Sequence, residues 1–267
     1  MNVHRGSYYN WLNNKDNVTQ HEQDRKNLES FIREINEKYP SFGYHMIAST
    51  IRNTYGWAIT DNLVHKVCKF LDIKSKTKRY RKYSESGNEH KTFPNIVDGN
   101  WRATSLYEKI VSDMTVLKHR GIKYEVTFYF DIFSRSIISF ASSRKQGDVK
   151  PYYEGLHKVL TKLKGINKQS ILHTDQGSVY SSMAFENAHK DYNIIRSMSR
   201  AGTPTDNPII ESFNGWMKSE IECNYKIDEW ETIEDFLEHY KYFYNNDRPA
   251  YALQYKTPNQ FMIDSGF

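Results

Sequence analysis

Residues 108–141 read EKIVSDMTVLKHRGIKYEVTFYFDIFSRSIISFA, and this stretch decides the fold. Its β-branched and aromatic residues fall into three runs, which predict successive strands at 109–117, 124–131 and 136–141. Farther along, the hydrophobic pattern predicts short strands at 170–173 and 194–197, and helices at 151–164, 181–190, 206–222 and 233–245. Three strands followed by alternating helices and strands predict an α/β fold, with a mixed sheet and helices packed on it.

The first 73 residues have a different pattern, typical of a small helical domain. Residues 22–38 carry Leu28, Phe31, Ile32 and Ile35 at helical spacing. A second helix is expected at 44–53 and a third from Asp61, which we expect to cap it. Two short helices joined by a Gly-containing turn fit a helix-turn-helix that binds DNA. A three-helix bundle without a DNA role fits equally well.

Residues 74–100 are expected to form a basic linker between this domain and residues 101–267. Six basic residues lie within nine positions: Lys74, Lys76, Lys78, Arg79, Arg81 and Lys82. The net charge of +5 comes entirely from residues 1–100, which hold 16 Lys and Arg against 11 Asp and Glu. This bias favours an acidic polymer such as DNA as the partner. A solvated tether is the alternative interpretation of the same run.

Composition excludes several classes of protein. The chain has 267 residues, 38% of them hydrophobic, so it can bury a sizeable core. Its two cysteines, Cys68 and Cys223, lie far apart and support neither a disulfide framework nor a zinc site. No apolar run of membrane-spanning length and no signal segment is present. We therefore expect a soluble, cytoplasmic protein with no membrane partner.

Three acidic residues lie in settings that favour metal chemistry. Asp113 lies inside the first predicted strand, where an ionised carboxylate is costly unless it is paired or binds a cation. Asp175 directly follows a short strand, and Glu211 lies one turn into a helix, after 35 intervening residues. Carboxylates that converge can hold two Mg²⁺ ions, which phosphodiester chemistry uses. Each acid alone is more commonly a turn, cap or surface residue.

Two further acids compete with these three. Asp131 ends the second predicted strand and could replace Asp113 in such a site. Asp206 precedes the helix of Glu211, and we expect it to be the N-cap of that helix. Spacing alone leaves both alternatives open.

Several motifs surround these acids in a fixed order. They are Gly6-Ser7-Tyr8-Tyr9-Asn10-Trp11, Ser112-Asp113-Met114-Thr115, His173-Thr174-Asp175-Gln176-Gly177, Ser197-Met198-Ser199-Arg200, Asp206-Asn207-Pro208-Ile209-Ile210-Glu211, and Tyr244-Asn245 with Arg248-Pro249. Together they resemble the retroviral-integrase-type DDE transposases. The match is closest to the downstream-frame transposase of bacterial insertion sequences that encode their enzyme in two overlapping frames. The resemblance covers nearly the whole chain.

The resemblance implies an RNase H-like integrase catalytic core at 101–267, with a five-stranded mixed sheet, flanking helices and a C-terminal helical tail. It implies metal-dependent DNA cleavage and strand transfer at insertion-sequence ends, which is the chemistry of DNA transposition, integration and recombination. Asp113, Asp175 and Glu211 would be the catalytic residues and the ligands of two Mg²⁺ or Mn²⁺ ions. Asp131 and Asp206 would lie outside this triad.

The partners expected from the resemblance are double-stranded DNA, further copies of this chain on that DNA, and an upstream-frame product or frameshift fusion. Lys218 lies two helical turns after Glu211 on the same face, and Arg200 lies in the preceding loop. We expect both to contact DNA phosphates, although a solvent-facing Lys218 is nearly as plausible. Two other functions fit the same carboxylates less well: an RNase H-like nuclease acting on hybrid or branched nucleic acid, and an inactive DNA-binding regulator.

Overall fold

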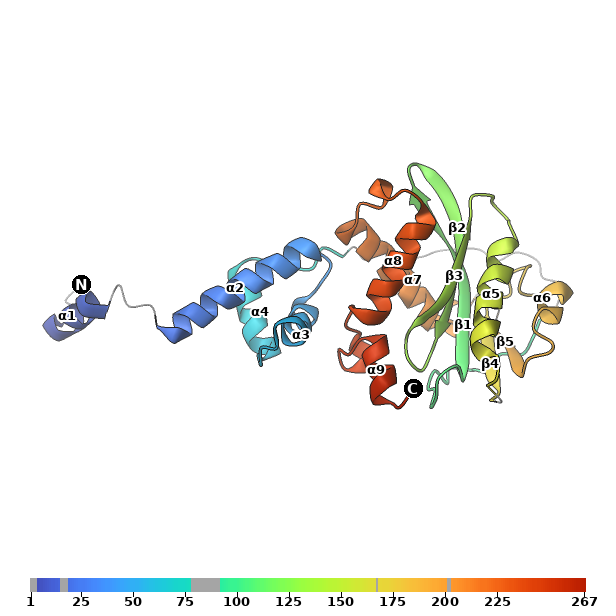
Figure 1. Ribbon diagram of the computed structural model, residues 1–267, viewed down its shortest axis with the longest axis horizontal. Helices are drawn as coiled ribbons and strands as arrows, with labels where there is room; N and C mark the ends of the chain where they lie inside the picture. The colour runs from blue at the N-terminus through green and yellow to red at the C-terminus, as the bar shows by residue number, and fades with distance from the viewer. Residues whose placement is uncertain (1–3, 15–18, 78–91, 167, 201–202) are drawn as a thin grey trace. The chain divides into compact units, whose positions relative to one another are not determined.

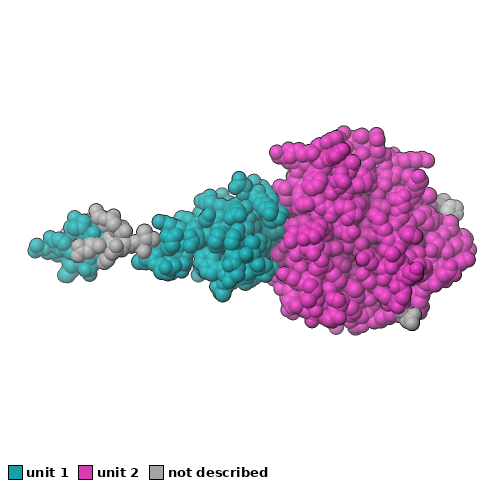
Figure 2. Space-filling view, viewed as in Figure 1, with its two compact units in different colours: residues 1–76 teal, residues 77–267 magenta. Residues whose placement is uncertain are grey.

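The computed structural model describes residues 4–14, 19–77, 92–166, 168–200 and 203–267. The chain divides into two compact units, residues 1–76 and residues 77–267, which Figure 2 shows in different colours. The first unit is helical, and the second combines a sheet with helices.

The first unit contains four described helices: α1 (Arg5–Asn14), α2 (Gln20–Lys38), α3 (Tyr44–Tyr55) and α4 (Asp61–Phe70). The last three lie where the hydrophobic spacing predicts helices. Their core comes from the apolar faces, and it includes Leu28, Ile32, Ile47, Ile51, Val64 and Val67. Gly56 ends α3 in the left-handed region at φ 63°, a conformation that costs glycine little.

The cap of α4 differs from the expected one. Thr60 is the N-cap, and its hydroxyl accepts a hydrogen bond of 3.3 Å from the Leu63 amide. Asp61 is the first helical residue, and its carboxylate pairs with Arg52 at 2.7 Å and with His45 at 2.5 Å. The prediction that Asp61 caps this helix is therefore wrong. Threonine and aspartate are both good N-cap residues. Here the Asp61 carboxylate binds Arg52 and His45, and Thr60 is the N-cap.

The second unit is built on one five-stranded mixed sheet in the order β3-β2-β1-β4-β5. Its strands are β1 (Lys109–His119), β2 (Ile122–Asp131), β3 (Ile137–Ser143), β4 (Ser170–Thr174) and β5 (Ile194–Met198). The pairs β1–β2 and β2–β3 are antiparallel, whereas β1–β4 and β4–β5 are parallel. The predicted mixed sheet is thus confirmed, with each strand at its expected place.

Five α-helices of the second unit are described, and Figure 1 shows how they flank the sheet. They are α5 (Lys150–Leu163), α6 (Met183–Asn187), α7 (Pro208–Asn224), α8 (Ile233–Asn246) and α9 (Pro258–Asp264), with 3₁₀ turns at Pro204–Asp206, Ile227–Glu229 and Tyr251–Leu253. The helix α6 is shorter than the predicted 181–190. The helix α7 begins at Pro208 rather than Asp206.

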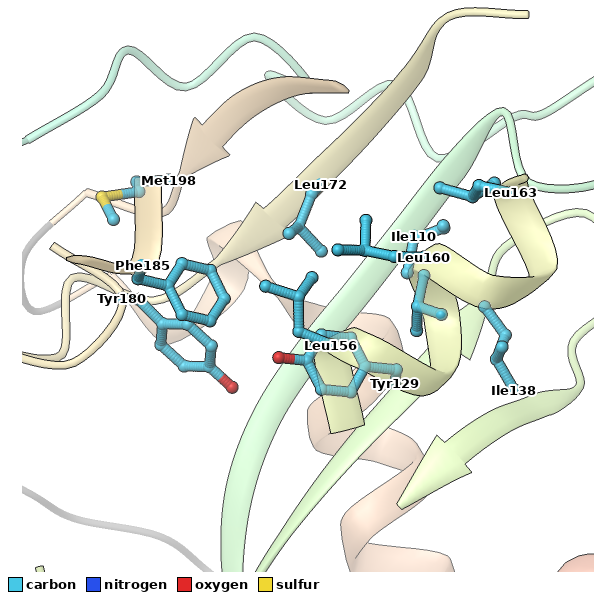
Figure 3. Packing of buried hydrophobic residues seen from close by; sticks show 11 residues of the cluster. Ile110, Tyr129, Ile138, Leu156, Leu160, Leu163, Leu172, Tyr180, Phe185 and Met198 are labelled. Atoms are coloured by element: carbon cyan, nitrogen blue, oxygen red, sulfur yellow. The ribbon is translucent and has the colours of Figure 1, made fainter. Parts of the chain in front are cut away.

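One face of the sheet packs against α5. Figure 3 shows Leu156 and Leu160 of this helix beside Ile110, Tyr129 and Leu172 of three strands. Gly155 permits the close approach of the helix, because a Cβ there would lie 2.5 Å from the Tyr129 ring. Each large apolar side chain buried in this way contributes about 1.5–3 kcal/mol.

The opposite face carries an aromatic cluster that holds α7 against the strands. Phe213 of α7 lies 5.3 Å from Phe128 and 5.1 Å from Phe130 of β2, measured between ring centroids. Tyr244 of α8 packs edge-on against Phe213 at 5.3 Å. The side chains of β1 alternate between the two faces, so that Ser112 meets Tyr180 on the α5 side and Asp113 meets α7.

Candidate active site

Asp113 lies in the middle of β1 and is partly buried. Its Oδ2 accepts a hydrogen bond of 2.8 Å from Nδ2 of Asn214, a residue of α7 that is only 3% exposed. A buried carboxylate needs such donors to remain ionised. The bond also ties α7 to the strand that carries Asp113.

Asp175 follows the last residue of β4, which runs parallel to β1. In the register of these strands Val111 pairs with His173, and Asp113 and Asp175 each lie two residues farther on. Carboxyl ends of adjacent parallel strands are a common location for functional groups in α/β sheets. We call Asp113 and Asp175 the strand-end pair.

The local turn shapes the Asp175 carboxylate. Its Oδ1 accepts a hydrogen bond of 3.0 Å from the Gly177 amide, and a Cβ at position 177 would lie only 3.0 Å from the same oxygen. Asp175 is an exposed residue. Desolvation by the protein atoms around its carboxyl group nevertheless raises its pKa, and the Gly177 bond lowers that pKa in part. Glycine in His-Thr-Asp-Gln-Gly thus leaves room for the carboxylate.

The buried Tyr180 and the partly buried Tyr152 are both affected by the charges of the strand-end pair. Burial is the main cause of the raised pKa of Tyr152 and of Tyr180. The negative charges of Asp175 and Asp113 raise the pKa of both phenols further. The two carboxylates therefore act on the same rings, as expected of groups at neighbouring strand ends.

Glu211 lies in the first turn of α7 and is partly exposed. Its amide donates to the Asn207 carbonyl at 3.3 Å, the first bond of the helix. Asn214, which binds Asp113, lies three residues later on the same side of α7. Within the described ranges, no group of three or more His, Cys, Asp or Glu side chains is close enough to hold a metal ion. The structure thus joins the Glu211 helix to Asp113 without forming a closed cluster of the three acids.

Asp206 does not cap α7, contrary to the sequence-based expectation. The N-cap is Asn207, which makes no capping hydrogen bond with its side chain. Both oxygens of Asp206 instead bind Arg200: Oδ2 accepts from its backbone amide at 2.9 Å and from Nε at 2.8 Å, and Oδ1 accepts from Nη2 at 2.8 Å. The hydrogen bond from Arg200 is the main reason that the pKa of Asp206 is lowered.

His173 is fully buried between the last two strands and the turn before α7. Its Nδ1 lies 2.9 Å from Ser197 Oγ, and its Nε2 lies 3.1 Å from Ser199 Oγ and 2.9 Å from the Asp206 carbonyl oxygen. Burial lowers the pKa of His173 to about 4, so the ring is neutral near pH 7. These contacts agree with a structural role for His173.

Asp131 is fully buried at the end of β2, and both of its carboxylate oxygens accept hydrogen bonds. Oδ1 accepts from the Tyr107 amide at 2.9 Å, and Oδ2 accepts from the amide and the hydroxyl of Ser134, each at 2.7 Å. Burial raises the pKa of Asp131, and the Ser134 bonds oppose that shift. These donors give Asp131 a structural function.

The candidate DNA-binding residues lie in different surroundings. Lys218 is exposed on α7, and Lys74 is exposed beside Asp72, with its Nζ 2.8 Å from that carboxylate. Lys76 is exposed, and its amide donates to the Pro40 carbonyl at 3.0 Å. The rest of the basic run, namely Lys78, Arg79, Arg81 and Lys82, lies outside the described residues.

Asn214 is the residue of this region that the sequence alone did not reveal. An asparagine three residues after a helical glutamate has no distinctive pattern, and only its contact with Asp113 shows its importance. The helical spacing from Glu211 was the available signal.

None of the described helices is both long and apolar enough to cross a membrane.

Comparison with known families agrees with this architecture. The family described as Integrase core domain matches residues 103–204, and a second family of the same description matches residues 192–258. The two matches together span β1 to the end of α8 and therefore include all three candidate acids.

Individual relatives extend the similarity over most of the chain. InsK of insertion sequence element IS150 from Escherichia coli is 28% identical over 264 residues, covering 97% of this chain and 89% of the relative. The transposase for insertion sequence element IS904 from Lactococcus lactis is 25% identical over 248 residues, covering 89% and 94%. Among solved structures, a simian T-cell lymphotropic virus intasome matches 80% of this chain and 73% of its own at a TM-score of 0.50 and 15% identity, which supports the fold alone.

Proposed function

The chain belongs to the DDE transposases of the integrase superfamily, and we propose that it cleaves insertion-sequence ends and joins them to other DNA, with Asp113, Asp175 and Glu211 as its catalytic residues. The observation that carries this proposal is the placement of the strand-end pair. Two carboxylates lie at the same level of adjacent parallel strands, and Asn214 ties the Glu211 helix to one of them.

The same three residues would hold two Mg²⁺ or Mn²⁺ ions. Their chemistry fits, since these hard cations prefer carboxylate oxygens. The raised pKa of Asp175 also fits, because a nearby cation would offset the desolvation that raises it. When bound, such ions supply an activated water or 3′-hydroxyl and stabilise the leaving 3′-oxygen.

The residues of the chain itself would orient these ligands. The Asn214 amide fixes one oxygen of Asp113, and the Gly177 amide fixes one oxygen of Asp175. The Glu211 side chain is partly exposed in the first turn of α7, where rotation about its side-chain bonds would bring it toward the strand-end pair.

Double-stranded DNA is the proposed substrate. Lys218 projects from the same helix as Glu211, and the basic run at 74–82 follows the helical unit. Cations in these positions would neutralise phosphates and release counterions. We propose that further copies of the chain assemble on the DNA ends, together with an upstream-frame product or a frameshift fusion.

The decisive experiment follows a labelled element end in Mn²⁺ with the wild-type protein and the Glu211→Gln variant. We expect the wild type to nick the end and join its 3′-hydroxyl to a second duplex, and the variant to bind the end without reacting. Hydrolysis without joining, strongest on an RNA–DNA hybrid, would instead indicate a nuclease. Equal nicking and joining by both proteins would overturn the catalytic assignment.

A further inference from the structure

We propose that His173, Arg200 and Asp206 form a clamp that positions Glu211 for the reaction, and we call these three residues the Asp206 clamp. This inference rests on the proposed function, since it assigns a role in the same site. The three are positioning residues, because they act on Glu211 through the start of its helix. The proposal changes the role expected for Arg200 from a phosphate contact to an internal support.

The side chain of Asp206 is held by three donors from one residue. The Arg200 guanidinium meets both carboxylate oxygens at 2.8 Å, and the Arg200 amide adds a third bond at 2.9 Å. Paired bonds of a guanidinium to a carboxylate fix orientation as well as distance. Asp206 is 7% exposed, so this geometry is sheltered on the carboxylate side even though the Arg200 side chain is 66% exposed.

The backbone of Asp206 is held from the other direction by His173. A carbonyl only accepts, so Nε2 of His173 must donate to the Asp206 oxygen at 2.9 Å. Nδ1 then accepts from the Ser197 hydroxyl at 2.9 Å. The Ser197 oxygen in turn accepts from the amides of Ile96 and Val97 at 2.9 and 3.3 Å. One tautomer therefore satisfies both the Asp206 and the Ser197 contacts of the ring.

This network fixes Asp206 to the sheet. His173 of β4 and Ser197 of β5 are register partners, so the histidine is held by two adjacent strands. The turn that contains Asp206 leads within two residues to the first residue of α7. Because Asn207 provides no side-chain cap, the start of α7 depends on the support that Asp206 receives.

Glu211 thus lies between two anchors. The Asp206 clamp precedes it by five residues, and Asn214 binds Asp113 three residues after it. A shift of about 1 Å at a reacting group costs roughly a hundredfold in rate. Loosening the clamp should therefore slow the reaction while leaving the DNA surface intact.

The alternative, in which Arg200 binds a phosphate directly, makes a different prediction. A phosphate would have to displace Asp206 from the guanidinium. Removing Asp206 would then improve DNA binding, whereas removing Arg200 would weaken it and lower its salt dependence. In the clamp, the two residues act as one unit, and removing either has the same effect.

The test compares Arg200→Gln, Asp206→Asn and the double variant at saturating element-end DNA in Mn²⁺. We expect each single variant to slow single-turnover nicking by about tenfold to a hundredfold, with end affinity changed by no more than about twofold. The double variant should be no slower than the slower single variant, because both remove the same interaction. His173→Gln, which keeps a donor, should retain more activity than His173→Leu.

Two controls separate positioning from loss of folding. Asp264→Asn removes an exposed ion pair between Asp264, at the end of the short helix α9, and Lys256. This variant should nick DNA at the wild-type rate. Thermal unfolding of each variant reports the folded state. If Asp206→Asn unfolds, Arg200→Lys replaces it, since that variant keeps the charge but loses the paired geometry, and intermediate activity is expected.

Three results would overturn the clamp. The single and double variants could all nick at the wild-type rate, or the rate losses of the two single variants could multiply in the double variant. The third is a loss of DNA affinity in Arg200→Gln that Asp206→Asn does not share. These outcomes require a wild type that reacts. If the wild type and Glu211→Gln both fail to nick and join, the proposed function fails, and the clamp fails with it.

Discussion

Asp131 and Asp113 lie on neighbouring antiparallel strands of one sheet, yet the protein treats their carboxylates differently. The fully buried Asp131 carboxylate accepts three hydrogen bonds of at most 2.9 Å, two from Ser134 of the following turn and one from the Tyr107 amide. In the strand-end pair, Asp113 accepts a hydrogen bond from the Asn214 side chain, and Asp175 accepts one from the Gly177 amide. Asp131 is fully buried with donors on both oxygens, whereas Asp113 is partly buried and Asp175 is exposed.

This difference separates a structural acid from a candidate ligand. A carboxylate has two oxygens and about four acceptor positions. Where protein donors fill these positions, the group stabilises the fold and offers little to a cation. Where the residue is at least partly exposed, as in the strand-end pair, a cation can reach the carboxylate, which is the role proposed for this pair. The predictions below test this contrast, from the largest expected effect to the smallest.

The largest contrast is between Asp113→Asn and Asp131→Asn. We expect Asp113→Asn to slow nicking about a thousandfold, since metal ligands supply several kcal/mol of transition-state stabilisation. Asp131→Asn should instead cost about 1–3 kcal/mol of folding free energy, because its new NH₂ group would face the Tyr107 or Ser134 donors. Urea denaturation and nicking assays on both variants measure the two effects. Full stability with no activity in Asp131→Asn would contradict the distinction.

A smaller change removes one donor from each carboxylate. Asn214→Leu takes the donor from Asp113, and we expect nicking or Mn²⁺ affinity to fall about tenfold to a hundredfold, as is usual when the partner of a metal ligand is lost. Ser134→Ala takes one donor from Asp131 and should cost about 1 kcal/mol of stability without changing the rate. The readouts are the Mn²⁺ dependence of nicking and a urea titration. An Asn214→Leu variant with wild-type Mn²⁺ dependence would show that this bond does not support the site.

The contrast between the two kinds of acid was only partly accessible from the sequence. The strands and the positions of Asp113 and Asp175 on them could be predicted because period-two patterns and strand ends are local signals. The Tyr107 donor of Asp131 could not, because Tyr107 is 24 residues away and reaches Asp131 only after the sheet has formed. The Ser134 donors lie only three residues away, but the sequence does not show that they bind the carboxylate.

The turn before α7 shows the opposite error, in which a local signal misled. An aspartate just before a helix is typically its N-cap, so Asp206 was assigned that role. Arg200 lies six residues earlier, across a turn, and binds both of its oxygens more strongly than an amide would. An ion pair with a nearby arginine can thus override the capping preference of an aspartate. Asp61, which pairs with Arg52 instead of capping α4, is a second example.

The buried imidazole of His189 provides a third test. His189 is 4% exposed, and its Nε2 has no hydrogen-bond partner within the described part of the chain. Burial, helped by the charge of Arg196, lowers the pKa of His189 to about 4. The unfolded chain binds this proton below about pH 6.5, so the stabilising contribution is complete above that pH and is lost as pH falls toward 4.

His189→Phe should therefore flatten the acid side of the stability profile. At pH 5 the difference in slope should approach about 1.4 kcal/mol per pH unit, the value for one proton. Urea titrations at pH 7, 6 and 5 measure it, with His157→Gln on the exposed side of α5 as the control. Parallel profiles for His189→Phe and the wild type would mean that the ring already gains a proton in the folded state.

The smallest expected effect concerns the surface beside the strand-end pair rather than the pair itself. Lys218→Gln should lower element-end affinity only a few-fold and reduce the slope of log K against log salt by about one, because one phosphate contact is lost. The matched control is Lys226→Gln, a 79% exposed lysine whose ion pair with Glu229 is worth little. Equal slopes for the two variants would remove Lys218 from the DNA surface. Unequal slopes would show that the helix that carries Glu211 also carries a residue that contacts the DNA.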